Sequence, residues 1–270
     1  MNIGEKTEHI VCSILHYEAK MTPLTSNLRS ITRESRKDIK YINKKDRTAI
    51  CDIINDKGFS SFNVTSPSDG SSCGKRSTAD ILLYNRDSAR SVGLSIKHNN
   101  MSIKHHRPHM LHKQMKLPSD LSFEFQNEYK RIEDKWLKFT SSFSKYNEID
   151  VFDRRKMLSD FNVLTTKWLN NNIAHISTYV NFIMDKQTPY ILKVNSNGTI
   201  EVYKKKRYSI NNPFIYVNHE KGCINIVLDR DNNMNPAIIS MRLHTCSKYI
   251  KSSLDIKFDV TAYGIFNKIA

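Results

Sequence analysis

The stretch TADILLYNRDSARSVGLSIKHNN, residues 78–100, decides the fold predicted for this chain. Asp80 opens a short apolar run, and fourteen residues lie between it and the Ser95–Lys97 tripeptide that ends a second apolar run. A polar segment, residues 85–88, separates the two runs. Apolar runs joined by a short polar turn are typical of a β-hairpin, so the two runs should pair as neighbouring strands.

The second strand of this hairpin should have two different faces. Side chains alternate along a strand, so Leu94 and Ile96 should point to one side and Ser95 and Lys97 to the other. The apolar pair suits a hydrophobic core. The polar pair would then stand beside Asp80, which brings a carboxylate, a hydroxyl and an amine together.

A carboxylate beside an ammonium group suits phosphodiester hydrolysis. The phosphate oxygens repel an incoming nucleophile, so a divalent cation is needed to withdraw charge and to acidify the attacking water. Asp80 is the expected ligand of that cation, and the Lys97 ammonium is expected to orient the nucleophile or offset the charge of the transition state. The alternative is that Asp80 simply ends a strand and Lys97 lies on a solvated edge, because such spacings also arise by chance.

The pattern resembles the PD-(D/E)XK nuclease superfamily, with Ala79 and Asp80 in place of the proline–aspartate pair and Ser95, Ile96 and Lys97 in place of the acidic-x-lysine triplet. Two longer segments are similar to parts of type II restriction endonucleases of the HaeIII-like group; they are GLSIKHNNMSIKHHRP (residues 93–108) and SMRLHTCSKYIKSSLDIKFDV (residues 240–260). The resemblance implies an α/β fold of the restriction endonuclease type, a mixed central sheet flanked by helices, with a helical insertion and a C-terminal β-rich segment.

The sequence departs from the family pattern at two places. Ala79 replaces the proline, and Ser95 replaces the second carboxylate. A serine hydroxyl is a weak ligand for a hard cation, so the metal should be held by Asp80, a main-chain carbonyl near Ile96, water and a carboxylate from elsewhere. Glu8 stands where many members carry a glutamate on the first helix, and is a candidate catalytic residue; the alternative is an ordinary exposed helix charge.

The resemblance implies a type II restriction endonuclease that cuts double-stranded DNA at a short specific sequence with Mg²⁺ as cofactor. GGCC or another four-base palindrome is the guessed target, and cleavage should leave a 5′-phosphate and a 3′-hydroxyl. The resemblance also implies a cognate DNA methyltransferase as the functional partner and the cytoplasm of a prokaryote as the location. The chain could in addition form a homodimer. Two alternatives remain: a non-sequence-specific repair or recombination nuclease of the same fold, and a non-enzymatic DNA-binding protein.

Composition also favours a nucleic acid partner. Lys and Arg total 42 against 27 for Asp and Glu, a net charge of +15 over 270 residues, which a polyanion would relieve. No apolar run reaches eighteen residues, the N-terminus lacks a signal-peptide pattern, and no basic cluster sits on a Trp- or Leu-rich amphipathic helix, so no membrane partner is expected. The five cysteines are scattered and form no CxxC pair, which indicates reduced thiols.

Further residues are expected to contact DNA because they flank the proposed site or lie in the second family-like segment. The candidates are Lys75, Arg76, His98, Asn99, Lys104, Arg107, Arg242 and His244. The first two lie in the Ser- and Gly-rich loop before Asp80, where a plain solvated linker is the alternative. The last two are expected to contact base edges, the alternative being contacts to phosphate alone. The histidines between residues 98 and 112 match no compact metal-ligand spacing.

The chain is predicted to form a single domain over residues 1–270, with a catalytic core at about 1–116, a helical region at about 119–186 and a β-rich segment at about 189–262. Apolar residues at helical spacing predict two helices before the hairpin and long helices in the middle region. Period-two alternation predicts strands in the last segment. The predicted elements are helices at 5–20, 46–58 and within 121–183, and strands at 59–64, 190–195, 199–205, 214–218, 223–228 and 237–245.

Overall fold

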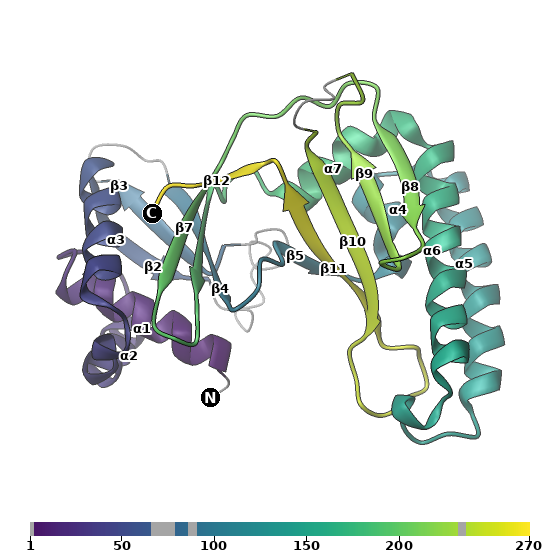
Figure 1. Ribbon diagram of the computed structural model, residues 1–270, viewed down its shortest axis with the longest axis horizontal. Coiled ribbons are helices and arrows are strands. Elements are labelled where there is room, and N and C mark those ends of the chain that lie inside the picture. The colour runs from purple at the N-terminus through teal and green to yellow at the C-terminus, as the bar shows by residue number, and fades with distance from the viewer. Residues whose placement is uncertain (1–2, 66–78, 86–90, 232–235) are drawn as a thin grey trace. The chain divides into compact units, whose positions relative to one another are not determined.

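The structure is a computed structural model that describes residues 3–65, 79–85, 91–231 and 236–270. The chain divides into two compact units, which are best followed separately in Figure 1. Unit 1 is Met1–Met101, Asp185–Lys206 and Phe266–Ala270, and unit 2 is Ser102–Met184 and Arg207–Ile265. The predicted mixed α/β fold with helices flanking a mixed sheet is confirmed. The expected β-rich segment at about 189–262 is shared between the two units.

Unit 1 contains, in its described residues, one mixed sheet of seven strands. These are β1 (Thr22–Pro23), β2 (Phe59–Val64), β3 (Ile81–Asn85), β4 (Ser91–His98), β6 (Tyr190–Val194), β7 (Ile200–Lys205) and β12 (Phe266–Lys268). Their order across the sheet is β1-β2-β3-β4-β6-β7-β12, with β1–β2 and β4–β6 parallel and the other pairs antiparallel. Its helices are α1 (Ile3–Tyr17), α2 (Ser26–Ser35), the 3₁₀ helix η1 (Arg36–Tyr41) and α3 (Lys44–Asp56).

Local sequence accounts for most of these elements. The two predicted N-terminal helices correspond to α1 and α3, and Gly58, with φ of 66°, supplies the left-handed conformation that ends the second of them. The helix α2 was not predicted, although Thr25 caps it, its hydroxyl oxygen accepting a hydrogen bond from the Leu28 N–H at 3.2 Å. The predicted hairpin of β6 and β7 is confirmed, with Gly198 at φ of 79° in its turn.

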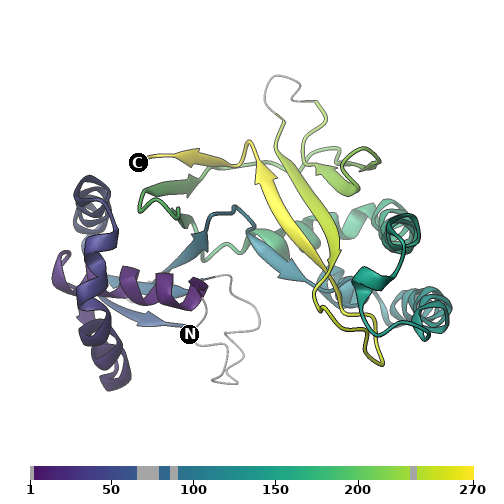
Figure 2. The same ribbon diagram turned by 60° about the horizontal axis from the view of Figure 1, so that its bottom comes forward.

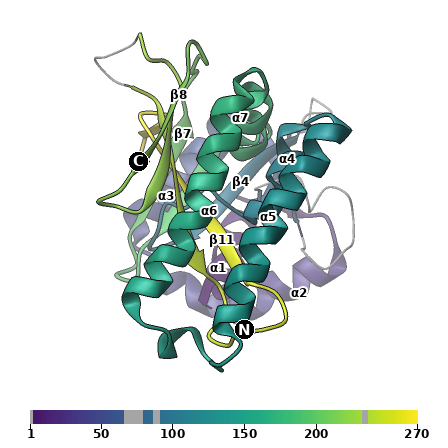
Figure 3. The same ribbon diagram turned by 90° about the vertical axis from the view of Figure 1, so that its right-hand side faces the viewer.

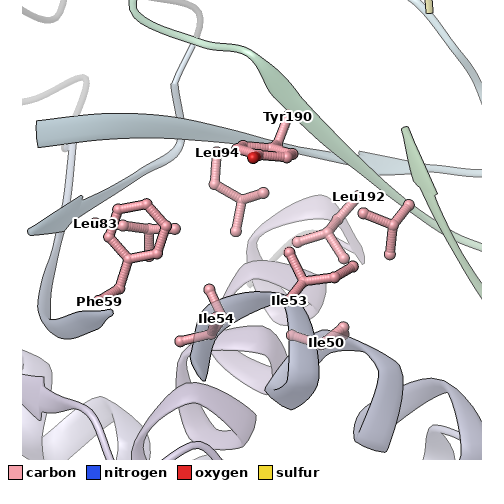
Figure 4. Close-up of a pocket in the computed structure, with 9 residues that line it drawn as sticks. Ile50, Ile53, Ile54, Phe59, Leu83, Leu94, Tyr190 and Leu192 are labelled. Atoms are coloured by element: carbon pink, nitrogen blue, oxygen red, sulfur yellow. The ribbon is translucent and has the colours of Figure 1, made fainter. Parts of the chain in front are cut away.

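One face of the unit 1 sheet carries its core. Leu94 and Ile96 of β4 point into this core, as the alternation predicts, and pack with apolar residues of α1 and α3. Figures 1 and 2 show these helices, in purple and dark blue, beside the strands. A cavity of about 20 Å³ remains between α3 and the sheet, and Figure 4 shows its lining of Ile50, Ile54 and other apolar side chains around Leu94. A space of this size without polar partners stays dry, so it is a packing gap.

Unit 2 contains, as far as its residues are described, one antiparallel sheet of order β5-β11-β10-β9-β8. Its strands are β5 (Lys104–His106), β8 (Phe214–Asn218), β9 (Cys223–Val227), β10 (Ile238–Thr245) and β11 (Ile256–Tyr263). Its helices are α4 (Leu111–Met115), α5 (Ser119–Thr140), α6 (Val151–Asn171) and α7 (Ile176–Met184), with 3₁₀ turns η2 (Pro108–Met110), η3 (Tyr146–Glu148) and η4 (Ile173–His175). Figure 3 shows the helices of unit 2 in front of this sheet.

The two faces of the unit 2 sheet differ in character. Met241 and Leu243 of β10 and Phe258 of β11 are buried, whereas the residues between them, such as Arg242, point to the opposite face. In the helices of unit 2, aromatic residues such as Phe125, Trp136 and Trp168 are buried, whereas Phe123, Phe139 and Phe152 are exposed. Phe152, in the first turn of α6, is 71% exposed. Among the described residues, no helix combines the length and the apolar character that crossing a membrane requires.

Candidate active site

The hairpin of β3 and β4 forms as predicted and places Asp80 opposite Ser95. The two strands pair antiparallel with Ile81 against Leu94, and the main-chain N–H of Asp80 donates to the carbonyl of Leu94 at 2.9 Å. Asp80 therefore continues the pairing one residue beyond β3. Its side chain lies on the face opposite the core residues, which is the face that Ser95 and Lys97 share.

The carboxylate of Asp80 is held by two hydrogen bonds to one of its oxygens. Oδ2 accepts from the hydroxyl of Ser95 at 3.1 Å and from the main-chain N–H of Ile96 at 2.5 Å. Burial raises the pKa of Asp80, while the charge of Lys97 and the two hydrogen bonds act in the opposite direction. Neither hydrogen bond uses Oδ1, so this oxygen keeps its lone pairs for a further ligand.

Glu8 on α1 belongs to the same electrostatic cluster. Its pKa rises to about 7, first because the carboxyl group is half-buried and then because Asp80 and Glu5 are negatively charged; Lys97 acts against this rise. A neighbouring carboxylate raises a pKa because two like charges share one region. Helix α1 packs against β4, and Glu8 on this helix is within electrostatic range of both Asp80 and Lys97. The structure thus brings Glu8, Asp80 and Lys97 together, as the family resemblance implies for its catalytic residues.

The donor set of this cluster fits Mg²⁺. Asp80 and Glu8 offer carboxylate oxygens, and Mg²⁺ is usually bound by one or two carboxylates together with water and substrate phosphate. In the described part of the chain no group of three or more His, Cys, Asp or Glu residues could hold a metal ion, so a cation here would depend on the phosphate and water for its other ligands. That dependence is the ordinary behaviour of Mg²⁺ at phosphoryl-transfer sites.

Gly93 allows the close packing beside Asp80. A Cβ atom at this position would lie 2.7 Å from the Ala79 Cβ, 2.7 Å from the Thr188 Oγ1 and 2.9 Å from the Gln187 carbonyl oxygen. The main-chain N–H of Gly93 donates to that carbonyl at 2.6 Å. The signal for this contact in the sequence is the glycine itself, since a glycine inside a strand pattern often marks a close approach of this kind.

A second group that the sequence analysis missed lies on the strands next to β4. Lys193 of β6 is the direct partner of Lys97, and Glu201 of β7 is the direct partner of Lys193. The hairpin of β6 and β7 was predicted from sequence, and its alternation pairs Lys193 with Glu201. The parallel pairing of β6 with β4 was not predicted, and only that pairing brings Lys193 beside Lys97.

Two of the expected DNA contacts in unit 1 lie at the end of β4. His98 is near Thr7 and Ser196, with ring nitrogens 3.4 Å and 3.5 Å from their hydroxyl oxygens. The Asn99 side chain donates to the Ser196 hydroxyl at 2.6 Å and accepts from the Ser196 main-chain N–H at 2.8 Å. Asn99 therefore braces the turn between β6 and β7. Lys75 and Arg76, also expected to contact DNA, lie outside the described residues.

The residues of unit 2 that were expected to contact DNA differ in their exposure to solvent. Lys104 is buried, and its ammonium donates to the Phe182 carbonyl at 2.7 Å, so the expectation that it contacts DNA is wrong. The physical reason is the alternation of β5, which turns Lys104 and His106 toward the helices and His105 toward solvent. Arg107 is half-exposed and pairs with Asp255 at 2.8 Å. Arg242 is exposed on β10.

His244 shares one carboxylate with a neighbouring histidine. Its Nδ1 lies 3.0 Å from Asp259 Oδ2, and the Nδ1 of His105 contacts the other oxygen of Asp259. Burial lowers the pKa of His244, and Asp259 acts against that change. His106, next to His105 in the sequence, has a different environment. It points into the core, where its Nε2 lies 3.1 Å from the Tyr179 hydroxyl.

Comparison of the chain with protein-family models, with curated proteins and with solved structures finds no match in any of the three. The fold and the site define the class: a mixed α/β protein in which two carboxylates and a lysine meet at a β-hairpin of the larger sheet.

Proposed function

We propose that this chain is a Mg²⁺-dependent deoxyribonuclease of the PD-(D/E)XK type that cuts double-stranded DNA, acting as a type II restriction endonuclease. The observation that carries the proposal is the electrostatic coupling of Asp80, Glu8 and Lys97 in unit 1. Two carboxylates can hold a hard cation while an ammonium group beside them holds a phosphate. Perturbed carboxyl pKa values at such a place are more common at functional sites than elsewhere.

Each residue has a separate role in the proposed reaction. Mg²⁺, when bound, withdraws charge from the scissile phosphate and lowers the pKa of the attacking water. Asp80 and Glu8 would hold the cation with their carboxylates, and in Asp80 the Oδ2 atom already accepts from Ser95 and Ile96. Lys97 donates to the phosphate oxygen that gains charge as the reaction proceeds. The hydroxyl of Ser95 orients Asp80 and does not contact the substrate.

The bond changes are those of hydrolysis. The water oxygen forms a bond to phosphorus, the bond between phosphorus and the 3′-oxygen breaks, and the water proton passes to solvent. The 3′-oxygen takes a proton and leaves as a hydroxyl, and the phosphate remains on the 5′ side. The negative charge that grows on the phosphate oxygens is the reason that a fixed ammonium group beside them lowers the barrier.

The remaining parts of the proposal rest on the family resemblance and on charge. The restriction endonuclease assignment includes a short palindromic target such as GGCC and a cognate methyltransferase. It also includes a homodimer and a location in the cytoplasm of a prokaryote. The net charge of +15 favours DNA as the partner. In unit 2, Arg242 and His244 share the face of β10 opposite the core, which leaves them as the proposed base contacts.

Digestion of a supercoiled plasmid tests the proposal and separates its alternatives. Purified protein with Mg²⁺ should give discrete fragments, and EDTA should prevent cutting. A smear of fragments would favour the non-specific nuclease, and intact DNA that merely shifts on a gel would favour a DNA-binding protein. Sequencing the fragment ends would then give the target and the cut position.

A further inference from the structure

A row of charged side chains crosses three neighbouring strands of unit 1, starting at Lys97. The register pairs Lys97 of β4 with Lys193 of β6 and Lys193 with Glu201 of β7. Directly paired residues project to the same face of a sheet, so all three lie on the face of Ser95. Neighbouring strands are about 4.8 Å apart, so Lys193 begins one strand spacing from the proposed catalytic lysine.

Glu201 holds Lys193 in a defined position. Its Oε2 lies 2.8 Å from the Lys193 ammonium, and its Oε1 lies 2.9 Å from the ammonium of Lys268 on β12. Hydrogen bonds from these two lysines lower the pKa of Glu201 to about 2. Each carboxylate oxygen therefore has its own lysine, and the carboxylate stays ionised at any pH of interest.

The row keeps an excess of positive charge. Beyond Lys97, whose charge faces Asp80 and Glu8, the two lysines Lys193 and Lys268 share the single negative charge of Glu201. The side chains of Lys193 and Glu201 are 22% and 21% exposed, so the ammonium of Lys193 remains within reach of solvent and of a ligand. Partly exposed ion pairs add little to stability, so stability alone does not account for two lysines around one glutamate.

A lysine one strand away from Lys97 can reach the phosphate next to the scissile one. Each DNA strand carries one negative charge per rise of about 3.4 Å along the helix axis, and neighbouring phosphates are farther apart than this rise because they wind around the axis. A long side chain that begins about 4.8 Å from Lys97 can span to the second phosphate. We infer that Lys193 binds the phosphate next to the scissile one, and that Glu201 is a positioning residue for its ammonium group. This inference rests on the proposed nuclease function.

Substitution of Lys193 tests the phosphate contact. The binding of a DNA duplex to the non-cleaving Asp80→Asn protein should weaken about tenfold when Lys193→Ala is added, the usual effect of one hydrogen bond to a charged group. The slope of log affinity against log salt should become shallower by about 0.9, since one phosphate contact is lost. Lys193→Arg should restore both values. With Asp80 intact, Lys193→Ala should raise KM and leave kcat at saturating DNA unchanged.

Lys45→Ala is the matched control, because Lys45 is exposed on α3, the helix that packs on the opposite face of this sheet. If Lys193→Ala and Lys45→Ala give the same affinity and the same salt slope, the inference is overturned. Lys193→Gln keeps the length of the side chain and serves as the second variant if the alanine variant melts at a lower temperature. A loss of kcat at saturating DNA with unchanged affinity would also overturn it.

Glu201→Gln tests the positioning role through the sign of its effect. Removing a negative charge should strengthen DNA binding if only long-range electrostatics matter. Loss of the contact that fixes Lys193 should instead weaken binding and raise KM. Tighter or unchanged binding would overturn the role of Glu201. If Asp80→Asn abolishes cleavage while Lys193→Ala behaves as its control, the proposed function stands and this inference falls; if Asp80→Asn still cuts, the proposed function itself falls.

Discussion

At the scale of single residues, the pKa of Glu8 shows how the cluster works. Burial and the neighbouring carboxylate of Asp80 raise it to about 7, and Lys97 limits the rise. A cation between the two carboxylates would remove the repulsion that the protein alone does not offset. The one positive charge of Lys97 does not balance the carboxylates of Glu8, Asp80 and Glu5. This agrees with the separate role proposed for Lys97 at the phosphate.

Lys97→Ala should reduce cleavage by about 10²–10³-fold, because a preorganised donor at a developing negative charge has an effect of that size. Binding of DNA should fall only slightly, since one phosphate contact is lost among many. Single-turnover cleavage and duplex binding measured on the same protein check both parts. Lys45→Ala provides the control for the loss of one positive charge. Cleavage within tenfold of the unsubstituted protein would remove Lys97 from the proposed mechanism.

At the scale of elements, the hairpin of β3 and β4 was predictable because its signals are local. The alternation at residues 92–97 and the polar turn before it determine which side chains share a face, and the structure agrees. The parallel pairing of β4 with β6 joins segments separated by the whole of residues 99–189, and no local pattern determines it. This is why Asp80, Ser95 and Lys97 could be grouped from sequence, whereas Lys193 could not.

Gly93→Ala should disturb the site through the strand that carries it. The added methyl group would meet Ala79, Thr188 and the Gln187 carbonyl at contact distances below 3 Å, so β4 or its neighbours must shift. Overpacking of this kind costs about 1–3 kcal/mol, and the shift should also move Asp80 and reduce cleavage. Leu94→Ala, on the opposite face of β4, is the comparison: it should cost about 2–5 kcal/mol and leave the activity of the folded protein unchanged. Equal activity of the two variants per folded molecule would be evidence against this account of Gly93.

A second prediction at this scale concerns β5, whose His106 points into the unit 2 core. Burial lowers the pKa of His106 to about 3, and nearby Lys104 adds to the effect. The folded-state pKa is below the unfolded value of 6.5, so the stabilising contribution is complete above that value and is lost as pH falls from about 6.5 toward 3. The loss is at most about 1.4 kcal/mol per pH unit for one proton.

His106→Gln keeps a polar side chain near Tyr179 and removes this titration. Its free energy of unfolding, relative to the unsubstituted protein, should therefore improve as pH falls from 6.5 to 4.5. Urea unfolding at several pH values measures the difference in free energy of unfolding between the two proteins. The other titrating groups are the same in both proteins, so their contributions cancel in this difference. A difference that stays constant over this range would show that His106 is not buried in the neutral form.

At the scale of the whole molecule, composition favours a class of partner but does not place the contacts that such a partner would make. The excess of fifteen positive charges is a property of the sequence, and it favours nucleic acid whatever the fold. The position of each lysine depends on burial, which composition does not contain. Lys104 is buried and donates to the Phe182 carbonyl, while Arg242 is exposed, although both were expected to contact DNA.

The affinity for DNA should fall steeply as salt rises, by about 0.9 in the log-log slope for each neutralised phosphate. A site-specific enzyme should also keep a large advantage for its target at fixed salt, because base-edge contacts survive screening better than long-range attraction. Titration of target and non-target duplexes with Asp80→Asn protein across a salt series, with Ca²⁺ present, measures both. Equal affinities at every salt would favour a non-specific nuclease or a DNA-coating protein.

The rate of DNA cleavage by Asp80→Asn, with Mg²⁺ and saturating duplex, tests the central claim most directly. The amide carries no charge to attract the cation, so cleavage should fall by about 10³-fold or more, while duplex binding stays near that of the unsubstituted protein. Asp52→Asn is the control, since it makes the same chemical change on an exposed position of α3 and should leave both values unchanged. Cleavage by Asp80→Asn at a rate within tenfold of the control would contradict the assignment of this site as the nuclease centre.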